Sequence, residues 1–159
     1  MLTVQTETAR IAAELRRATK GPAWHGPALL EVLADVTPLQ AVARPIPGAH
    51  TVWEIARHAA TWLDILHERI DGQHRDVPDD EDWQIVDDTS PAAWQRLRAG
   101  LGDAAERLAA RIERFPDDAL DAKLPGADAS ASSAYVSLHG IVQHVVYHAG
   151  QIAVLKKGS

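Results

Sequence analysis

Four long stretches of the chain carry apolar residues at the spacing of an amphipathic helix, and they constrain the fold more than any other feature. This spacing places the apolar side chains on one side of each helix, where they need a partner surface for burial. Strand-like alternation does not rise above background anywhere in the sequence. The four stretches run from Thr3 to Lys20, from Thr51 to Ile70, from Pro91 to Phe115 and from Ser133 to Lys157. In a chain of 159 residues they predict an all-α fold, a four-helix bundle.

Residues at the ends of these stretches support the predicted boundaries. Thr51 and Glu54 have the spacing of a capping box, in which each side chain accepts a bond from the other residue's backbone N–H. Ser90 and Pro91 supply an N-cap and a first-turn proline for the third long helix. We therefore expect both helices to begin at these positions.

The segments between the long helices are of unequal length. A short helix is expected over residues 27–35, after the first long helix. The connectors over residues 37–50 and 73–89 are long enough for crossover connections, so simple up-down order is not required. The second of them is acidic and contains proline, and long loops of this kind often border a functional site.

Composition indicates an ordinary globular protein with one domain over residues 1–159. Apolar residues make up 46% and charged residues 24%, which is enough apolar material for a buried core. There is no run of 18 apolar residues to predict a membrane span, and the first ten residues lack a secretory signal's order. A cytoplasmic location with no membrane partner is therefore expected. The net charge of -6, without any lysine or arginine block, argues against nucleic acid as a partner.

The chain has no cysteine, so transition-metal ligands must come from His, Asp or Glu. His144 and His148 lie about one turn apart in the fourth stretch, on a stripe with Ile141, Gln151 and Leu155. Burying an imidazole without a partner costs about 1–3 kcal/mol. A metal ion is one possible partner and a hydrogen bond across the bundle is another, and the spacing leaves both open. Gln151 is expected to hold a histidine or to donate to a ligand, with plain packing as the alternative.

His58 is the third candidate ligand, because it lies on the inward stripe of the second long helix with Ile55 and Trp62. A lone histidine on such a stripe is usually a hydrogen-bonded core residue, but here a second helix offers a pair. Three neutral imidazoles leave an open position for water or substrate, as in catalytic zinc sites. Nickel, iron and manganese also accept nitrogen ligands. We expect Trp62, one turn after His58, to lie near the metal pocket.

Two better-known types of metal site are excluded by single residues. In the HExxH motif of metallohydrolases a glutamate follows the first histidine and acts as general base, but here Val145 occupies that position. A di-iron site needs Glu-x-x-His pairs, whereas Glu54 lies four positions before His58 and is expected to cap its helix. No Gly-rich phosphate loop, Rossmann fingerprint or Ser/His/Asp order is present.

The remaining histidines and the tryptophans are interpreted as structural. His67 falls opposite His58 on the helical wheel and is expected in solvent, whereas His139 is expected to pack or bond away from the stripe. His25, next to Trp24, is expected to pack before a helix rather than to flank a pocket. Most of the five tryptophans are expected to be core anchors.

A single histidine in the second long helix, followed by His-x-x-x-His-Ala-Gly-Gln-Ile in the last, resembles the DinB-like (YfiT-type) metalloprotein superfamily. The segment RPIPGAHTVWEIARHAATW resembles the start of that family's second helix, and YHAGQI resembles its last-helix signature. The resemblance covers residues 3–157. It implies a bundle with crossover connections and a divalent metal, zinc or nickel, held by three histidines. Carried over to this chain, the ligands are His58, His144 and His148.

The resemblance also implies a set of activities. Members with known activity are similar to metal-dependent transferases of low-molecular-weight thiols such as bacillithiol or mycothiol, others resemble hydrolases, and homodimers are common. We therefore expect an S-transferase whose partners are a small-molecule thiol and an electrophile. A metal-dependent hydrolase and a non-catalytic, metal-stabilised stress-response bundle are the alternatives, and DNA binding conflicts with the acidic charge. Asp64 or a carboxylate between Asp76 and Asp88 could serve as a base, and the spacing selects none of them.

Overall fold

The computed structural model describes residues 5–159, and within this range the chain forms helices and no β-strand. The body of the molecule consists of four long helices, α1 (Glu7–Lys20), α4 (Val52–Ile70), α6 (Pro91–Glu113) and α7 (Ala134–Leu155). The connectors contain the short helices α2 (Leu29–Leu33), α3 (Pro38–Val42) and α5 (Asp79–Asp82) and the 3₁₀ turn η1 (Asp117–Ala119). The predicted all-α helical bundle is confirmed.

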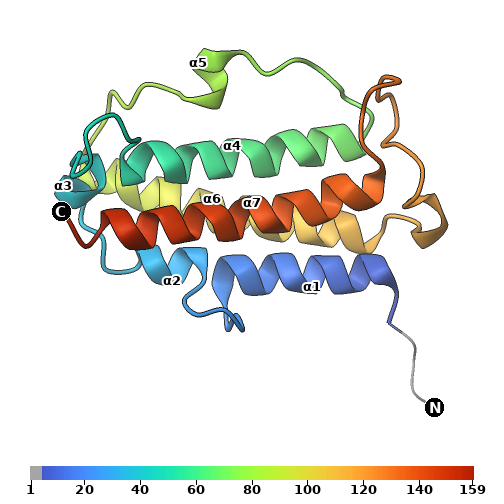
Figure 1. Ribbon diagram of the computed structural model, residues 1–159, viewed down its shortest axis with the longest axis horizontal. Helices are drawn as coiled ribbons and strands as arrows, with labels where there is room; N and C mark the ends of the chain where they lie inside the picture. Colours follow the sequence, from blue (N-terminus) through green and yellow to red (C-terminus); the bar gives the residue numbers. More distant parts are fainter. Residues whose placement is uncertain (1–4) are drawn as a thin grey trace.

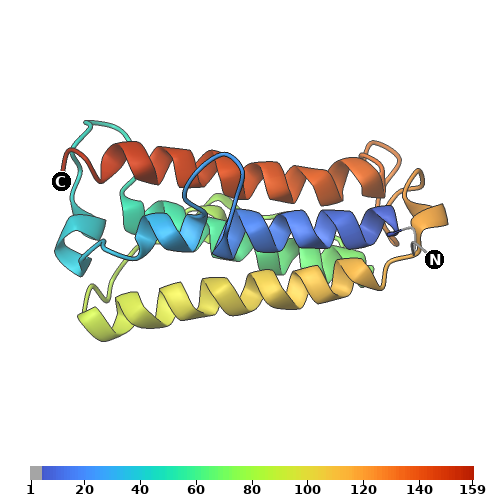
Figure 2. The ribbon, with the colours of Figure 1, turned by 90° about the horizontal axis from the view of Figure 1, so that it is seen from below.

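The long helices lie side by side, and α1 and α4 each pack against both α6 and α7. Following the colours from blue to red shows that α1 and α7 run in one direction and α4 and α6 in the other (Figures 1 and 2). Because α4 and α6 are parallel, the segment between them must return along the whole bundle, and α5 lies within it (Figure 1). The long connector over residues 73–89 is therefore a crossover, as its length allowed.

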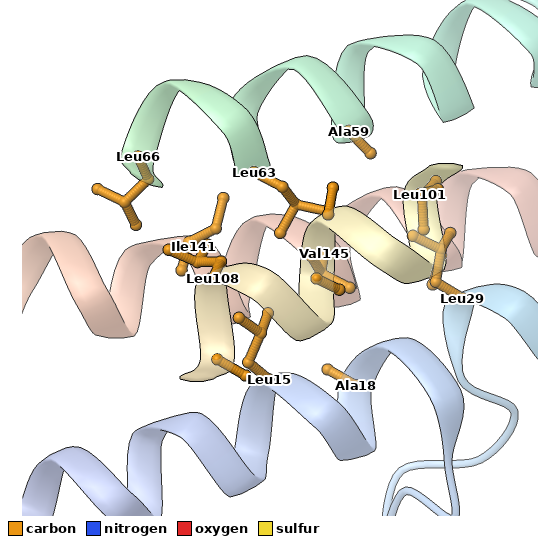
Figure 3. Close-up of a cluster of buried hydrophobic side chains, with 14 of the residues drawn as sticks. Leu15, Ala18, Leu29, Ala59, Leu63, Leu66, Leu101, Leu108, Ile141 and Val145 are labelled. Atoms are coloured by element: carbon orange, nitrogen blue, oxygen red, sulfur yellow. The ribbon is translucent and has the colours of Figure 1, made fainter. Parts of the chain in front are cut away.

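A continuous apolar core runs between the long helices. Its central side chains come from all four of them and interlock in Figure 3: Leu15, Leu63, Leu108, Ile141 and Val145. All are buried, and each fully buried side chain of this size contributes about 1.5–3 kcal/mol relative to exposure. The periodic apolar stripes of the sequence thus account for the bundle.

The predicted caps are present. Thr51 and Glu54 form the capping box, with 2.7 Å from the Thr51 N–H to Glu54 Oε2 and 3.1 Å from the Glu54 N–H to Thr51 Oγ1. Ser90 Oγ accepts the N–H of Ala93 at 3.2 Å and begins α6. Two capping hydrogen bonds at the start of α4 and one at the start of α6 fix these helix starts without help from distant parts of the chain.

Other predicted boundaries were wrong. The first helix begins at Glu7, not Thr3, because the Thr6 side chain caps it by accepting the N–H of Ala9; positions 3 and 4 lie outside the described residues. The helix expected over 27–35 is only the five residues of α2, and α3 and α5 were not predicted. None of the helices in residues 5–159 is long and apolar enough to cross a membrane.

Candidate metal centre

Helices α4 and α7 bring His58, His144 and His148 together on the side that the crossover covers. The face of α4 that buries Ile55 also carries His58 inward, and the face of α7 that buries Val145 carries the other two. His58 and His148 are buried and His144 is half-buried. Nε2 of His144 lies 3.0 Å from Nε2 of His58 and 3.0 Å from Nε2 of His148. All three rings therefore present the same nitrogen to one point.

This donor set fits a divalent metal ion. The ligand atoms all lie within 4.8 Å of one another. Zn–N bonds of about 2.0–2.1 Å in a tetrahedral site hold two nitrogens roughly 3.4 Å apart, so an ion needs only a small outward shift of the rings. Three nitrogen ligands leave a fourth position for another group, and imidazole suits zinc and nickel alike.

Burial favours the neutral form of His144 and His148. Burial lowers the pKa of His144 to about 3, and its neighbours His148 and His58 add to the effect. Burial also lowers the pKa of His148, against a smaller opposing effect of its hydrogen bond with Gln151. A neutral ring keeps the lone pair that a metal needs, so at neutral pH these two residues are already in the binding form.

Two of the three rings are oriented by oxygen acceptors at Nδ1, the ring nitrogen that points away from the cluster. Nδ1 of His148 lies 2.6 Å from Oε1 of Gln151, the contact expected of a residue that holds a histidine. Nδ1 of His58 lies 3.0 Å from Oδ1 of Asp82 and 3.1 Å from its backbone oxygen. A proton on Nδ1 leaves Nε2 free for a metal, and such contacts fix the ring and raise its basicity. Nδ1 of His144 is buried and has no hydrogen-bond partner in residues 5–159.

The crossover supplies an aromatic lid that the sequence did not reveal. Trp83 stacks flat on His58 at 4.0 Å between ring centroids, and its other side stacks on His50 at 3.5 Å. Trp62 lies close to the centre, as expected, with its ring 6.0 Å from that of His144. Its Nε1 donates to Oδ1 of Asp82 at 2.6 Å. Trp62 thus fixes the same carboxylate that orients His58.

Several polar contacts fasten the crossover to α4. The Arg57 guanidinium donates to the backbone oxygen of Ile85 at 2.9 Å, and Arg75 bonds both Glu68 and Glu81. These bonds hold the segment on either side of Asp82 and Trp83. The expectation that this acidic segment borders the site is confirmed.

An apolar cavity of about 620 Å³ opens beside His148. Its walls come from α4, α7, the crossover and the connector before α4: Ile46, Ala49, His50, Ile55, Trp83, Tyr147, His148, Gly150, Gln151, Val154 and Leu155. No carboxylate is among these lining residues. A molecule in this cavity therefore meets mostly hydrocarbon and reaches the histidine cluster at His148.

One family model matches the chain. The model of the DinB superfamily matches residues 23–152, a range that contains all three histidines, Trp62, Asp82 and Gln151. The chain belongs to the DinB superfamily. No curated protein and no solved structure matches it significantly.

Other side chains of this DinB protein lie away from the centre. Asp64, one of the carboxylates considered as a base, is more than half exposed and pairs with Arg107 at 3.1 Å. His67 is about one-third exposed and lies 3.8 Å from Asp71, so it is less solvated than expected. His139 Nε2 lies 3.4 Å from Glu7, away from the cluster, as expected.

The tryptophans of this DinB protein follow the prediction only in part. Trp53 and Trp94 are buried core anchors, whereas Trp62 and Trp83 border the histidine cluster. Trp24 is fully exposed and His25 beside it is also exposed, so the expected packing of this pair was wrong. The connector before α2 directs both side chains away from the core.

Replacing Asp82 with asparagine is expected to lower zinc affinity by about 10-fold, the lower end of the effect of losing an outer partner of a metal ligand. The amide keeps an oxygen but loses the charge that supports both His58 and Trp62, while the backbone oxygen still accepts from His58. Competition with a chromophoric chelator measures the affinity. Asp80→Asn, an exposed change in the same short helix, is the control, and equal affinities in the two variants would contradict the role given to Asp82.

Proposed function

We propose that this protein is a divalent-metal-dependent S-transferase that joins a low-molecular-weight thiol to an apolar electrophile. The observation that carries the proposal is a cluster of three histidines, one of which, His148, lines an apolar cavity that has no lining carboxylate. Membership of the DinB superfamily supports it. The metal is proposed to be zinc or nickel, with His58, His144 and His148 as its ligands.

When bound, the ion would lower the pKa of a thiol so that its sulfur reacts as a thiolate at neutral pH. The protein's own residues do the rest. Asp82 and Gln151 hold the rings of His58 and His148, so the three nitrogens stay aimed at one point. Such preorganisation removes reorientation from the reaction barrier.

The cavity is suited to the electrophile rather than to a polar thiol. Ile46, Ile55 and Leu155 surround an apolar group, and the face of Trp83 supplies an aromatic surface. Burying apolar surface contributes about 25 cal/mol per Å² and excludes water from the reacting sulfur. An aromatic halide of suitable size fits this description.

The proposed reaction is a substitution. The thiol sulfur supplies an electron pair to the carbon of the electrophile, the new S–C bond forms and the carbon–halogen bond breaks. The halide leaves with the bonding pair and the thiol proton passes to solvent, so the products are a thioether, a halide ion and a proton. No oxidant or reductant is consumed.

Hydrolysis is less well supported because it needs a base beside the attacking water. Asp82 is turned towards His58 and Trp62, behind the ligand nitrogens, and Asp64 is paired with Arg107. Within the cavity lining, His50 is the side chain left for that task. A hydrolase would therefore depend on His50, whereas the transferase would not need it as a base.

The experiment compares thioether formation by the zinc-loaded and nickel-loaded protein, with cysteine or glutathione as thiol and a chloronitrobenzene as electrophile. We expect turnover above the uncatalysed rate, and a loss of at least about 100-fold in His58→Ala, as is usual for removing a group that stabilises the transition state. His67→Ala, a histidine of the same helix outside the cluster, is expected to keep the activity.

Two results would contradict the transferase. Ester or amide cleavage that depends on the metal and on His50, without thioether formation, would identify a hydrolase. Loss of the metal in His148→Ala with folding and every tested turnover unchanged would indicate a non-catalytic bundle.

A further inference from the structure

A second cavity, of about 530 Å³, lies at the other end of the α4–α7 pair. It is bounded by the last turn of α4, the start of the crossover, the connector before α7 and the first turns of α7 (Figure 1). In contrast to the first cavity, most of its lining side chains are polar or charged: Arg69, His74, Arg75, Asp76, Asp128, Ser132 and Ser137. None of them is one of the three clustered histidines or lines the apolar cavity.

Two hydrogen-bonding nitrogens in this cavity have no partner. Nε of Arg69 and Nε2 of His74 are both buried, and neither has a hydrogen-bond partner in residues 5–159. Leaving a buried donor unpaired costs about 1–3 kcal/mol, so such groups are rare unless something else pairs with them. A guanidinium can only donate, which means that the missing partner of Arg69 is an acceptor.

The charge of Arg69 is also uncompensated. Among residues 5–159 no carboxylate oxygen lies within 4.0 Å of its guanidinium nitrogens. The neighbouring Arg75 is already paired with Glu68 and Glu81. Asp128, at the rim, uses its Oδ1 to accept from Ser130 and Ala131 within its own loop. The other lining carboxylate, Asp76, also lies more than 4.0 Å from the guanidinium, so Arg69 has no ion-pair partner among residues 5–159.

The two loops that enclose the cavity are held in place by close backbone contact. Gly72 and Gly126 both have positive φ, 84° and 77°. A Cβ on Gly126 would lie 2.7 Å from the backbone oxygen of Gly72, so only glycine permits this approach. Arg69 is positioned in turn by Trp62, whose ring lies 5.3 Å from its Cζ. The loops and the guanidinium of Arg69 are thus held in place before any ligand arrives.

We propose that this cavity is a binding site for a small molecule that carries a carboxylate or phosphate group, held by Arg69 and His74. An oxyanion offers acceptors to both unpaired nitrogens and neutralises the guanidinium. Ser132 lines the same space and offers its hydroxyl group to a remaining oxygen, whereas the hydroxyl of Ser137 donates to the backbone oxygen of Ser133 at 3.1 Å. The proposal is independent of the reaction at the metal centre.

Calorimetric titration with inorganic phosphate and, separately, with succinate tests this site, using the protein with zinc and again after metal removal. We expect at least one anion to bind at one site per chain in both states. Phosphate alone would identify a phosphate group as the ligand, and succinate alone a carboxylate. In Arg69→Gln we expect affinity to fall by about 10-fold or more, as for the loss of a charged hydrogen bond.

Arg107→Gln is the matched control, because it removes the same charge from an exposed arginine of α6 that pairs with Asp64. His74→Gln tests the second donor in the crossover, where a change has little effect on helix packing. Equal affinity in Arg69→Gln and Arg107→Gln would overturn the proposal. So would binding that requires zinc, since the anion would then be held at the metal, and so would the absence of binding by either anion.

Discussion

Replacement of His148 by alanine is expected to lower the affinity for zinc and nickel by more than about 100-fold. Loss of a residue that merely orients a ligand costs about 10–100-fold, and loss of a ligand itself should exceed this. His148 supplies one of only three convergent nitrogens, and the nearest alternative donor, Oε1 of Gln151, lies on the far side of the ring at Nδ1. Calorimetric titration of the metal-free protein measures the change.

The matched control is His67→Ala, which removes an imidazole from the same bundle outside the cluster. Metal at about 100 times its dissociation constant should stabilise the wild type by about 2.7 kcal/mol, which raises Tm by roughly 5–10 °C. His67→Ala should show the same rise and His148→Ala should lack it. A rise of equal size in both variants would show that the ion binds elsewhere.

The fold followed from the sequence where the information is local. A capping box such as Thr51 with Glu54 uses residues three positions apart, and the apolar periodicity of a helix repeats within two turns. These signals predicted the long helices and left the connector lengths as the only guide to their order. That α4 and α6 are parallel depends on contacts between distant segments, which no local signal carries.

The residues of the candidate site likewise fall into those that a local signal could predict and those that it could not. His144, His148 and Gln151 share one helical face and could be grouped by spacing, and the helical period also turned His58 and Trp62 inward. The spacing did not predict the contacts that Asp82, Trp83 and His50 make at the site, because these contacts depend on the path of the crossover over α4. The sequence did predict that the acidic connector borders a site, but nothing in its spacing linked Asp82 or Trp83 to His58.

The same dependence on distant contacts explains why the tryptophans of this chain differ so widely in solvent exposure. Trp94 on α6 is 2% exposed. Its ring packs in a tilted arrangement against Trp53 of α4, with 4.9 Å between centroids, and its indole N–H donates to the backbone oxygen of Val36 at 2.8 Å. Trp24, in the connector before α2, is fully exposed. Sequence alone gave both the same interpretation, because an isolated tryptophan carries no sign of which neighbours the fold will bring to it.

Trp94→Ala is therefore expected to destabilise the protein by about 3–5 kcal/mol, since it leaves a large cavity and an unpaired backbone oxygen at Val36. Trp24→Ala truncates a tryptophan side chain that is exposed to solvent, and it should change the free energy of unfolding by no more than about 0.5 kcal/mol. Urea unfolding of both variants, followed by circular dichroism, measures the difference. Equal losses in the two variants would mean that Trp94 does not join α6 to α4 and to the turn at Val36.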